Sequence, residues 1–361
     1  MRLRRPGVPR VLILTSIVAP YRLPSFAALD GQPGMDLLVG FLSEGDSRRP
    51  WHPHGPVGFR YEIYLRRGAP AMGALHSLLT WRPDVVITGG IDHPAFVQAF
   101  LLKRVLGFRL CLWSESTPAD VRPGTPGRER LKRALVGIAD AVLVPGSAAA
   151  EYARSLGAKV VFVAPNAADN DFFALDGPRT SNGNPVVLYV GRLAREKGLN
   201  VLLRAWRKVE EHTAAELALV GSGPEEPRLR QEAETCGLRR VRWIPFVQQD
   251  ELRRLYHAAD VLVLPSWSEP WGFVVNEAMA SSLPVLTTNV VGAAPDLIID
   301  GENGWKVKPG DEAALADCLV ALLCDPELRR RMGEASKARI ASVTPTRWAE
   351  QVAAMVRDLS R

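Results

Sequence analysis

Short apolar runs rich in Val, Ile and Leu alternate with amphipathic stretches along the whole chain, and this alternation limits the possible folds more than any other feature. Each run has the length of a buried strand, and the stretches between runs have the composition of helices. Parallel strands need such crossovers, because a tight hairpin turn joins only antiparallel neighbours. The sequence therefore predicts an α/β protein built on parallel sheets.

The predicted strands form two series. The first series covers residues 11–17, 35–41, 61–65, 85–88, 110–113, 141–144 and 160–163. The second covers residues 186–190, 217–220, 241–243, 261–264 and 284–287. Between them lies DGPRTSNGNP, residues 176–185, which is polar, rich in Gly, Pro and Asn, and without a hydrophobic period. Such a segment is typical of a linker.

A chain of 361 residues is long enough for two ordinary domains. We expect two Rossmann-like domains, residues 1–175 and 186–344, that face each other across a ligand-binding cleft. Pro345 precedes the last helical stretch. We expect residues 345–361 to return to the first domain.

The positive charge of the chain is concentrated in its first half. The net charge is +6, of which residues 1–180 contribute +7 and residues 181–361 contribute −1. Basic residues cluster at Arg2, Arg4, Arg5 and Arg10, at Arg66 and Arg67, and at Arg128, Arg130, Lys132 and Arg133. Such clusters are commonly solvated faces; the alternative is peripheral association with an anionic membrane. Nucleic acid is not expected, because no recognisable nucleic-acid-binding module is present.

The first residues of the chain have the pattern of a signal peptide, a basic segment followed by an apolar run from Val11 to Ala19. We interpret this run as a buried first strand, because Pro20 directly follows the only small-residue cut site. No apolar run is long enough to span a bilayer. The four cysteines have no paired spacing, which favours reduced thiols and therefore a cytoplasmic protein. If the basic clusters bind lipid, the protein is expected at the inner face of the membrane.

Two loops of the second half have the residues that suit a phosphate. In VGRLAREKGL, Gly191 permits a sharp turn, and Arg192 and Lys197 stand just before a helix. Two fixed cations beside helical amide donors fit a diphosphate, while the alternative is an exposed basic loop. In VGSGPEE, two glycines flank Ser222, and this turn is equally typical of a tight strand-to-helix connection.

The segment SEPWGFVVNEA, from Ser268 to Ala278, sets Glu269 and Glu277 on either side of a glycine turn. It follows a predicted strand and opens a predicted helix. A carboxylate has two acceptor oxygens and can take both hydrogens of a vicinal diol, such as a ribose. The alternatives are a first-turn residue favoured by the helix dipole for Glu277 and a surface carboxylate for Glu269.

Together, the segments GRLAREKGL, GSGPEE, PSWSEPWGFVVNEAMA and PVLTTNVVGAAPDLIIDGENGW resemble glycosyltransferase family 4, the retaining nucleotide-sugar glycosyltransferases of GT-B fold. The resemblance covers the second half in order. The first half resembles the family more loosely, through VLILTSIVAPYRLPSF and VFVAPNAADNDFF. The fold implied is GT-B, with an acceptor-binding first domain and a donor-binding second domain.

The resemblance implies a role for each matching residue. Arg192 and Lys197 neutralise the donor diphosphate, Glu277 binds the ribose, and Glu269 meets the donor sugar. The remaining donor-side residues implied are Gly191, Ser222, Gly223, Phe246, Trp271, Gly272, Phe273 and Val274.

The first domain departs from the family pattern. Tyr21 and Arg22 stand where many members have a glycine-rich loop, and they are the acceptor-side candidates. His93 and Glu115 follow first-domain strands and are the candidates for a catalytic acid or base. The alternative for His93 is a residue at the start of a helix after Asp92, and we favour this alternative. The alternative for Glu115 is a carboxylate in a loop.

The implied reaction is sugar transfer with retention of configuration and without a metal or a bound cofactor. The co-substrate is a nucleoside-diphosphate sugar, UDP- or GDP-linked, carrying a hexose or an N-acetylhexosamine. The acceptor is a hydroxyl or amine of a lipid-linked or cell-surface saccharide, or of a natural-product core. The run DND at residues 169–171 imitates a metal-binding motif but fits a helix cap better. The alternatives are a nucleotide-sugar-binding protein without transferase activity and a nucleotide-sugar epimerase.

Overall fold

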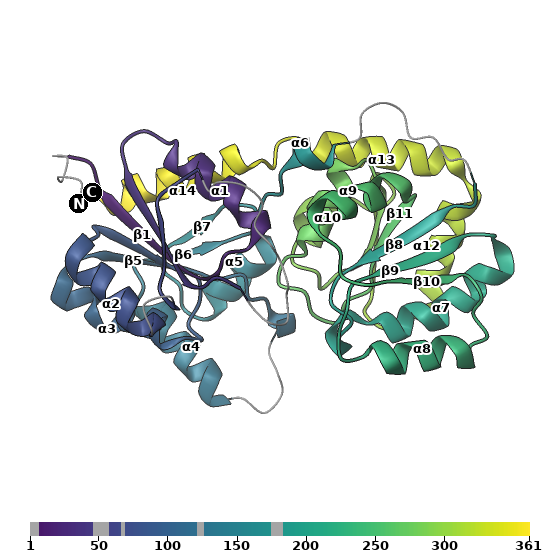
Figure 1. Cartoon of the computed structure of the whole chain (residues 1–361), viewed down its shortest axis with the longest axis horizontal. Helices are drawn as coiled ribbons and strands as arrows, with labels where there is room; N and C mark the ends of the chain where they lie inside the picture. Colours follow the sequence, from purple (N-terminus) through teal and green to yellow (C-terminus); the bar gives the residue numbers. More distant parts are fainter. Residues whose placement is uncertain (1–6, 46–57, 66–68, 121–125, 175–182) are drawn as a thin grey trace. The chain divides into compact units, whose positions relative to one another are not determined.

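The computed structural model describes residues 7–45, 58–65, 69–120, 126–174 and 183–361, except the side chains at 126 and 128 (Figure 1). The chain divides into two compact units. Unit 1 comprises Met1–Ala167 with Thr344–Arg361, and unit 2 comprises Ala168–Val343. Most of the predicted linker, and the basic residues Arg2, Arg4, Arg5, Arg66 and Arg67, lie outside the described residues.

Unit 1 is built on a parallel sheet with the order β3-β2-β1-β4-β5-β6-β7. Every pairing between neighbouring strands is parallel, as the alternation of strands and helices predicts. The strands are β1 (Arg10–Ile17), β2 (Asp36–Ser43), β3 (Tyr61–Ile63), β4 (Val85–Thr88), β5 (Arg109–Trp113), β6 (Ala141–Val144) and β7 (Val161–Val163).

The helices of unit 1 cover the two faces of this sheet. One face packs against α2 (Pro70–Trp81), α3 (Pro94–Leu106), α4 (Pro126–Ile138) and α5 (Ser147–Ser155). The other face packs against α1 (Leu23–Asp30) and the C-terminal helix α14 (Pro345–Leu359). Trp348 and Met355 of α14 are buried in this second core, so the C-terminal segment belongs to unit 1 (Figure 1). Short 3-10 helices, η1 (Pro20–Arg22) and η3 (Pro118–Asp120), follow β1 and β5.

Unit 2 has a second parallel sheet with the order β10-β9-β8-β11-β12-β13. Its strands are β8 (Val186–Val190), β9 (Glu216–Val220), β10 (Val241–Ile244), β11 (Val261–Leu264), β12 (Val285–Thr288) and β13 (Gly304–Val307). Its helices are α6 (Asn170–Phe173), η4 (Arg195–Lys197), α7 (Leu199–His212), α8 (Glu226–Thr235), α9 (Gln249–Ala258), α10 (Phe273–Ala280), α11 (Ala294–Leu297), α12 (Glu312–Cys324) and α13 (Pro326–Ile340).

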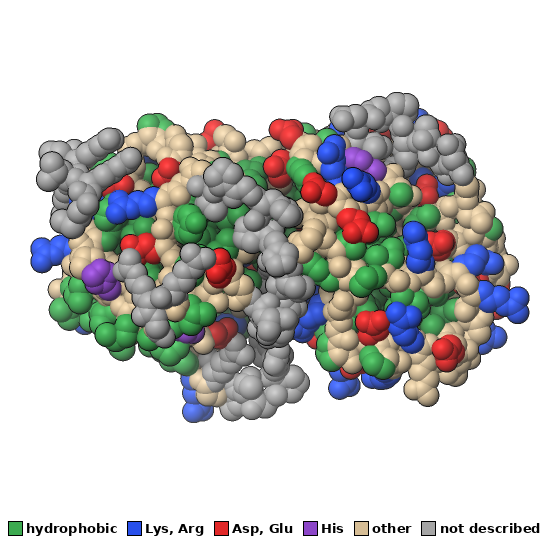
Figure 2. All heavy atoms as spheres, in the orientation of Figure 1, with side chains coloured by type: hydrophobic (Ala, Val, Ile, Leu, Met, Phe, Trp, Pro, Cys, Tyr) green, Lys and Arg blue, Asp and Glu red, His purple; other side chains and the backbone are tan. Residues whose placement is uncertain are grey.

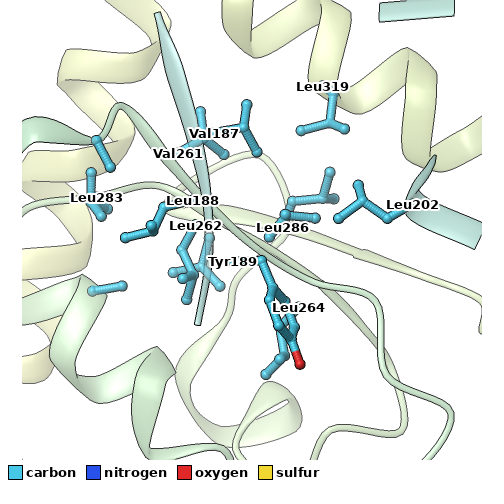
Figure 3. Packing of buried hydrophobic residues seen from close by; sticks show 14 of the residues in the cluster. Val187, Leu188, Tyr189, Leu202, Val261, Leu262, Leu264, Leu283, Leu286 and Leu319 are labelled. Carbon is cyan, nitrogen blue, oxygen red and sulfur yellow. The ribbon is translucent and has the colours of Figure 1, made fainter. Parts of the chain in front are cut away.

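The core of unit 2 forms where the central strands meet their helices (Figure 3). Val187 and Leu262, from β8 and β11, are fully buried with Leu202 of α7 and Leu319 of α12. Strands that are apolar on both faces are expected in a parallel sheet covered by helices on both sides. This core fixes the positions of the loops that follow β8, β9 and β11.

Each strand predicted from the sequence is present, with ends that differ by no more than a few residues. The strand β13 was not predicted. It is short and begins with Gly304, where a Cβ atom would lie 1.9 Å from the carbonyl oxygen of Val285 on the neighbouring strand. All four cysteines are free. In the part of the chain that the structure describes, no helix is long and apolar enough to cross a bilayer.

Candidate functional site

The sheet of unit 2 has a topological switch point at β8, where successive connections change direction. From β8 the chain adds β9 and β10 on one side, and then β11, β12 and β13 on the other. In open α/β sheets, ligands bind outside the carboxyl ends of the strands at such a point. The residues that follow β8, β9 and β11 here include Arg192, Ser222 and Glu269, all predicted from the sequence.

Lys197 and Glu269 form an ion pair at this edge of the sheet. Lys197 ends the η4 turn after β8, and its Nζ donates a hydrogen bond to Oε2 of Glu269 in the loop between β11 and α10. The two side chains are only 16% and 15% exposed. A lysine ammonium has three hydrogens, so this pairing leaves donors for a phosphate oxygen. The structure therefore joins two residues that the sequence separates widely.

Arg192 lies beside this pair with a partner that the sequence analysis missed. Its Nη2 is 2.6 Å from Oε1 of Glu196, one helical turn along the loop. Burial opposes ionisation of Glu196, but a backbone hydrogen bond and Arg192 outweigh it, and the pKa of Glu196 is lowered. The hydroxyl of Tyr189, on β8, donates to the Arg192 carbonyl oxygen at 2.9 Å and so anchors the turn to the strand. The spacing of four residues from Arg192 was the signal that could have identified Glu196.

Gly221 and Gly223 let the loops after β8 and β9 pack backbone to backbone. A Cβ atom at Gly221, whose φ is +136°, would lie 2.0 Å from the Gly191 carbonyl oxygen. A Cβ atom at Gly223 would lie 2.2 Å from the Leu193 carbonyl oxygen. The amide of Leu193 donates in turn to the carbonyl of Ser222 at 3.0 Å. These glycines are thus required by contact between loops, in line with the simpler of the two interpretations of this turn.

Glu277 is buried within α10, and only 6% of the residue is exposed. The hydroxyl of Tyr256, on α9, donates a 2.7 Å hydrogen bond to Oε2 of Glu277. Burial raises the pKa of Glu277 to about 7, and the hydrogen bond from Tyr256 opposes part of that rise. No sequence pattern pointed to Tyr256, because its contact with Glu277 depends on how α9 packs.

The turn before α10 supplies backbone donors and one buried aromatic. Gly272 has φ +96° and caps α10, so the amides of the first turn, beginning at Phe273 and Val274, are at its amino end. Trp271 is 1% exposed, and its Nε1 donates to Asn276 Oδ1 at 2.9 Å. Its indole is therefore a packing group. A separate contact joins two other loops of unit 2: the Phe246 amide, after β10, donates to Ser222 Oγ, after β9, at 3.4 Å.

In unit 1, Arg22 and Glu115 form a second, partly buried ion pair, at the carboxyl ends of β1 and β5. Arg22 Nη2 lies 2.7 Å from Glu115 Oε1, which also accepts from Asn166 Nδ2 at 2.6 Å. The guanidinium lies over the ring of Trp113, 4.2 Å from its centroid, and 5.6 Å from the ring centroid of the neighbouring Tyr21. Burial lowers the pKa of Arg22, but Glu115 outweighs this and the pKa is raised. No sequence pattern pointed to Arg22 and Glu115 as partners.

His93 and Asp169 have local structural roles. His93 is the N-cap of α3, and its Nδ1 accepts from the Ala95 amide at 3.1 Å. This confirms the favoured interpretation of a helix start; a catalytic role for His93 stays a prediction. Asp169 caps α6, with Oδ1 accepting from the Phe172 amide at 3.1 Å, as the capping interpretation predicts. Within the described residues, no group of three or more His, Cys, Asp or Glu side chains is placed to hold a metal ion.

Comparison with known proteins relates the site to a family. Residues 175–339 match the model of the family described as glycosyl transferases group 1. A glycogen synthase of Mycobacterium tuberculosis is 36% identical over 172 residues, which are 47% of this chain and 41% of that protein. A D-inositol 3-phosphate glycosyltransferase of Xylanimonas cellulosilytica is 33% identical over 260 residues, 66% of this chain and 61% of that protein. The chain thus spans about two fifths to three fifths of the length of these relatives.

A solved structure extends the similarity to both units. The Anabaena protein HepE, in complex with UDP and glucose, superposes with a TM-score of 0.77 at 19% identity. The superposition covers 97% of this chain and 99% of that one. At this identity the similarity concerns the fold, which is the GT-B fold of two parallel-sheet α/β domains.

Proposed function

Residues 175–339 belong to the glycosyl transferases group 1 family, and from this we propose that the protein transfers a sugar from a nucleoside-diphosphate sugar to an acceptor, with retention and without a metal ion. The donor binds to unit 2 and the acceptor to unit 1. The acceptor group is a hydroxyl or an amine, on a lipid-linked or cell-surface saccharide or on a small natural-product core. The observation that carries the proposal is the Lys197–Glu269 pair beside Arg192 at the switch point of the unit 2 sheet.

The two cations act on the leaving group. Breaking the bond between the sugar and the diphosphate leaves negative charge on a phosphate oxygen. Arg192 and Lys197, held by carboxylates in fixed positions, stabilise that charge as it develops. The amides at the start of α10 add uncharged donors. These groups together fill the role that a divalent ion has in other transferases.

The two glutamates bind the donor at different points. Glu277 accepts hydrogen bonds from the ribose diol through its carboxylate, and the Tyr256 hydroxyl holds one of its oxygens. Glu269 meets the donor sugar, and the contact with Lys197 orients its carboxylate. Glu277 is buried on α10 while Glu269 precedes the helix, which suits contacts at two places along one extended ligand.

Transfer with retention needs no protein nucleophile in this scheme. The acceptor oxygen forms its bond to the anomeric carbon on the face from which the diphosphate leaves, and the bond from that carbon to the phosphate oxygen breaks. The acceptor proton passes to the departing phosphate oxygen, so the products are the glycosylated acceptor and the nucleoside diphosphate. Neither His93 nor Glu115 is required as a base, which is consistent with their existing hydrogen bonds.

UDP is the first nucleotide to test, because HepE was solved in complex with UDP and with UDP-glucose. The experiment is a thermal-shift and calorimetric screen of UDP, GDP and their hexose and N-acetylhexosamine sugars, with and without EDTA. The test variant is Arg192→Ala with Lys197→Ala. Arg195→Ala is the matched control, because Arg195 is an exposed cation of the same η4 turn.

We expect one nucleotide sugar to bind in EDTA, and the double variant but not Arg195→Ala to lose that binding. Binding that requires Mn²⁺ would contradict the metal-free scheme. Donor binding without turnover on any offered acceptor, and without epimerised donor, would favour the alternative of a binding protein.

A further inference from the structure

Exposed large apolar side chains are concentrated on three helices of unit 1. Six lie on these helices: Met72 and Leu79 on α2, Leu101 and Val105 on α3, and Leu131 and Ile138 on α4. Tyr61, Leu65, Val160 and Val163 are exposed elsewhere in unit 1. Leu101 and Val105 are 72% and 79% exposed. In the described part of unit 2, only Trp267 and Ile299 are exposed to a comparable degree. Clustered exposure of this kind, unlike scattered single residues, marks an interaction surface.

The three helices form one continuous layer. They follow β3, β4 and β5 in the chain, α2 packs against α3, and the inner side chains of all three helices share one core on the same face of the sheet. On each helix the two exposed apolar residues are four or seven positions apart, and therefore lie on one side of the helix. Lys103 Nζ donates to the Ile138 carbonyl at 2.8 Å, so α3 and α4 are in contact. Figure 2 shows hydrophobic side chains gathered over α2 and α3.

The same layer is strongly basic. The helices α2 and α3 contain no acidic residue, and Glu129 of α4 accepts a 2.7 Å hydrogen bond from the Tyr152 hydroxyl. Arg104, Arg130 and Arg133 are exposed, and no ion pair joins them to another described residue. Just below the layer, Asp140 is neutralised by Lys103 at 2.9 Å. The apolar residues are thus accompanied by positive charge that the protein leaves uncompensated.

We propose that the outer face of α2, α3 and α4 docks on an anionic lipid bilayer. Apolar side chains enter the boundary between headgroups and acyl chains, and the arginines contact lipid phosphates. A second copy of this chain fits the face poorly, because two such faces would repel each other by their like charge. The inference does not rest on the proposed function, since neither the donor site nor the acceptor pair lies on these helices.

The test is flotation of the full chain with vesicles of phosphatidylcholine alone and with vesicles that also contain phosphatidylglycerol. We expect binding to the anionic vesicles, weakened by salt. Arg130→Gln with Arg133→Gln should weaken it by about 30-fold, and Leu101→Gln with Val105→Gln by at least about tenfold. Gln keeps helix propensity, and these side chains are exposed, so the fold is expected to persist. Ile299→Gln and Arg331→Gln, exposed positions of unit 2, are the matched controls.

Equal binding to neutral and anionic vesicles, or variants that bind like the wild type, would overturn the proposal. So would a dimer in sedimentation velocity that Leu101→Gln with Val105→Gln dissociates, because the face would then be a self-association surface. Nucleotide-sugar binding is measured on the same samples. A chain that binds vesicles but no nucleotide sugar would refute the proposed function and leave the docking surface supported.

Discussion

The Tyr256 hydroxyl donates a 2.7 Å hydrogen bond to Oε2 of Glu277, and both side chains are buried in unit 2. The contact links α9 to α10, and the Tyr256 ring also packs edge-on against Phe173 of α6, with centroids 5.7 Å apart. Oε1 of Glu277 has no hydrogen-bond partner among the residues that the structure describes. Tyr256 therefore holds one carboxylate oxygen in place, and in the proposed function the other accepts from the ribose.

Nucleotide affinity is expected to depend on pH through Glu277. Its pKa is raised to about 7 by burial, and only the ionised form accepts both hydrogens of a ribose diol. Affinity for UDP should therefore be highest above pH 7 and fall as the pH drops through that value. Tyr256→Phe removes a hydrogen bond that favours the charged form, so the midpoint of the profile should move to higher pH. Calorimetric titrations across this range measure both profiles.

Three other ionisable side chains lie on the elements that pack against α10. His257, on α9, has its Nε2 at 3.0 Å from the Phe173 carbonyl oxygen. Arg329, on α13, donates to the carbonyls of Leu322 and Leu323. Asp171, on α6, lies in the first turn of that short helix. If the affinity for UDP does not change through pH 7, or if Tyr256→Phe has the same pH profile as the wild type, Tyr256 does not act on the nucleotide site.

Glu277→Gln should stabilise the protein while abolishing nucleotide binding. The pKa of Glu277 in the folded state lies above its ordinary value of 4.5. Its contribution to stability is therefore present below pH 4.5 and lost as pH rises through 7, because folding then buries a charge. Replacement by the neutral Gln should raise the free energy of unfolding above pH 7 by up to about 3 kcal/mol, and by little near pH 4.

Urea denaturation at several pH values measures this effect. Glu302→Gln, at an exposed glutamate of the same unit, is the control and should show no such dependence. A glutamine variant that is less stable than the wild type above pH 7 would mean that Glu277 is not a destabilising buried charge. A stable variant that still binds UDP would separate the carboxylate from ribose recognition.

The fold could be predicted from the sequence because the chemistry of parallel sheets is local and repetitive. Runs such as that of β11, buried over all of Val261–Leu264, are apolar on both faces and stand out from the helices beside them. The strand β13 escaped prediction because Gly304 opens it and Trp305 and Lys306 are only half-buried. It can pair with β12 only because Gly304 has no side chain that would collide with the Val285 backbone, and this depends on tertiary contacts that a local sequence pattern does not show.

The candidate site could be predicted less completely. Motif spacing led to the predictions for Arg192, Lys197, Glu269 and Glu277, and their roles in donor binding stay predictions. Their partners were not found, since Tyr256 reaches Glu277 only through the packing of α9. The sequence also could not separate the two tryptophans of one loop. Trp271 is buried, whereas Trp267 is 45% exposed beside η4.

Loss of Lys197 should weaken donor binding more than loss of Arg192. Each removes a charge-assisted hydrogen bond to phosphate, which contributes about 1.5–3 kcal/mol, or roughly 10- to 150-fold in affinity. Lys197→Ala also leaves the Glu269 carboxylate without its partner, beside the place proposed for the diphosphate. Calorimetry with UDP measures both variants, with Arg195→Ala as the control. Equal losses would show that Glu269 does not face the diphosphate.

Glu115 is expected to act on Arg22 rather than on the acceptor proton. Its Oε1 already accepts hydrogen bonds from Arg22 and Asn166, so this oxygen is engaged within the protein. Glu115→Gln should lower the free energy of unfolding by about 1–3 kcal/mol, because it leaves a mostly buried guanidinium without its counter-charge.

A double-mutant cycle separates the two roles of Glu115. Arg22→Met with Glu115→Gln should cost less stability than the two single changes added together, because the double variant leaves no buried charge unpaired. Transfer by Glu115→Gln, measured below the temperature at which it unfolds, should keep the pH profile of the wild type. Additive losses of stability, together with a transfer rate that no longer rises with pH, would instead assign Glu115 to proton abstraction.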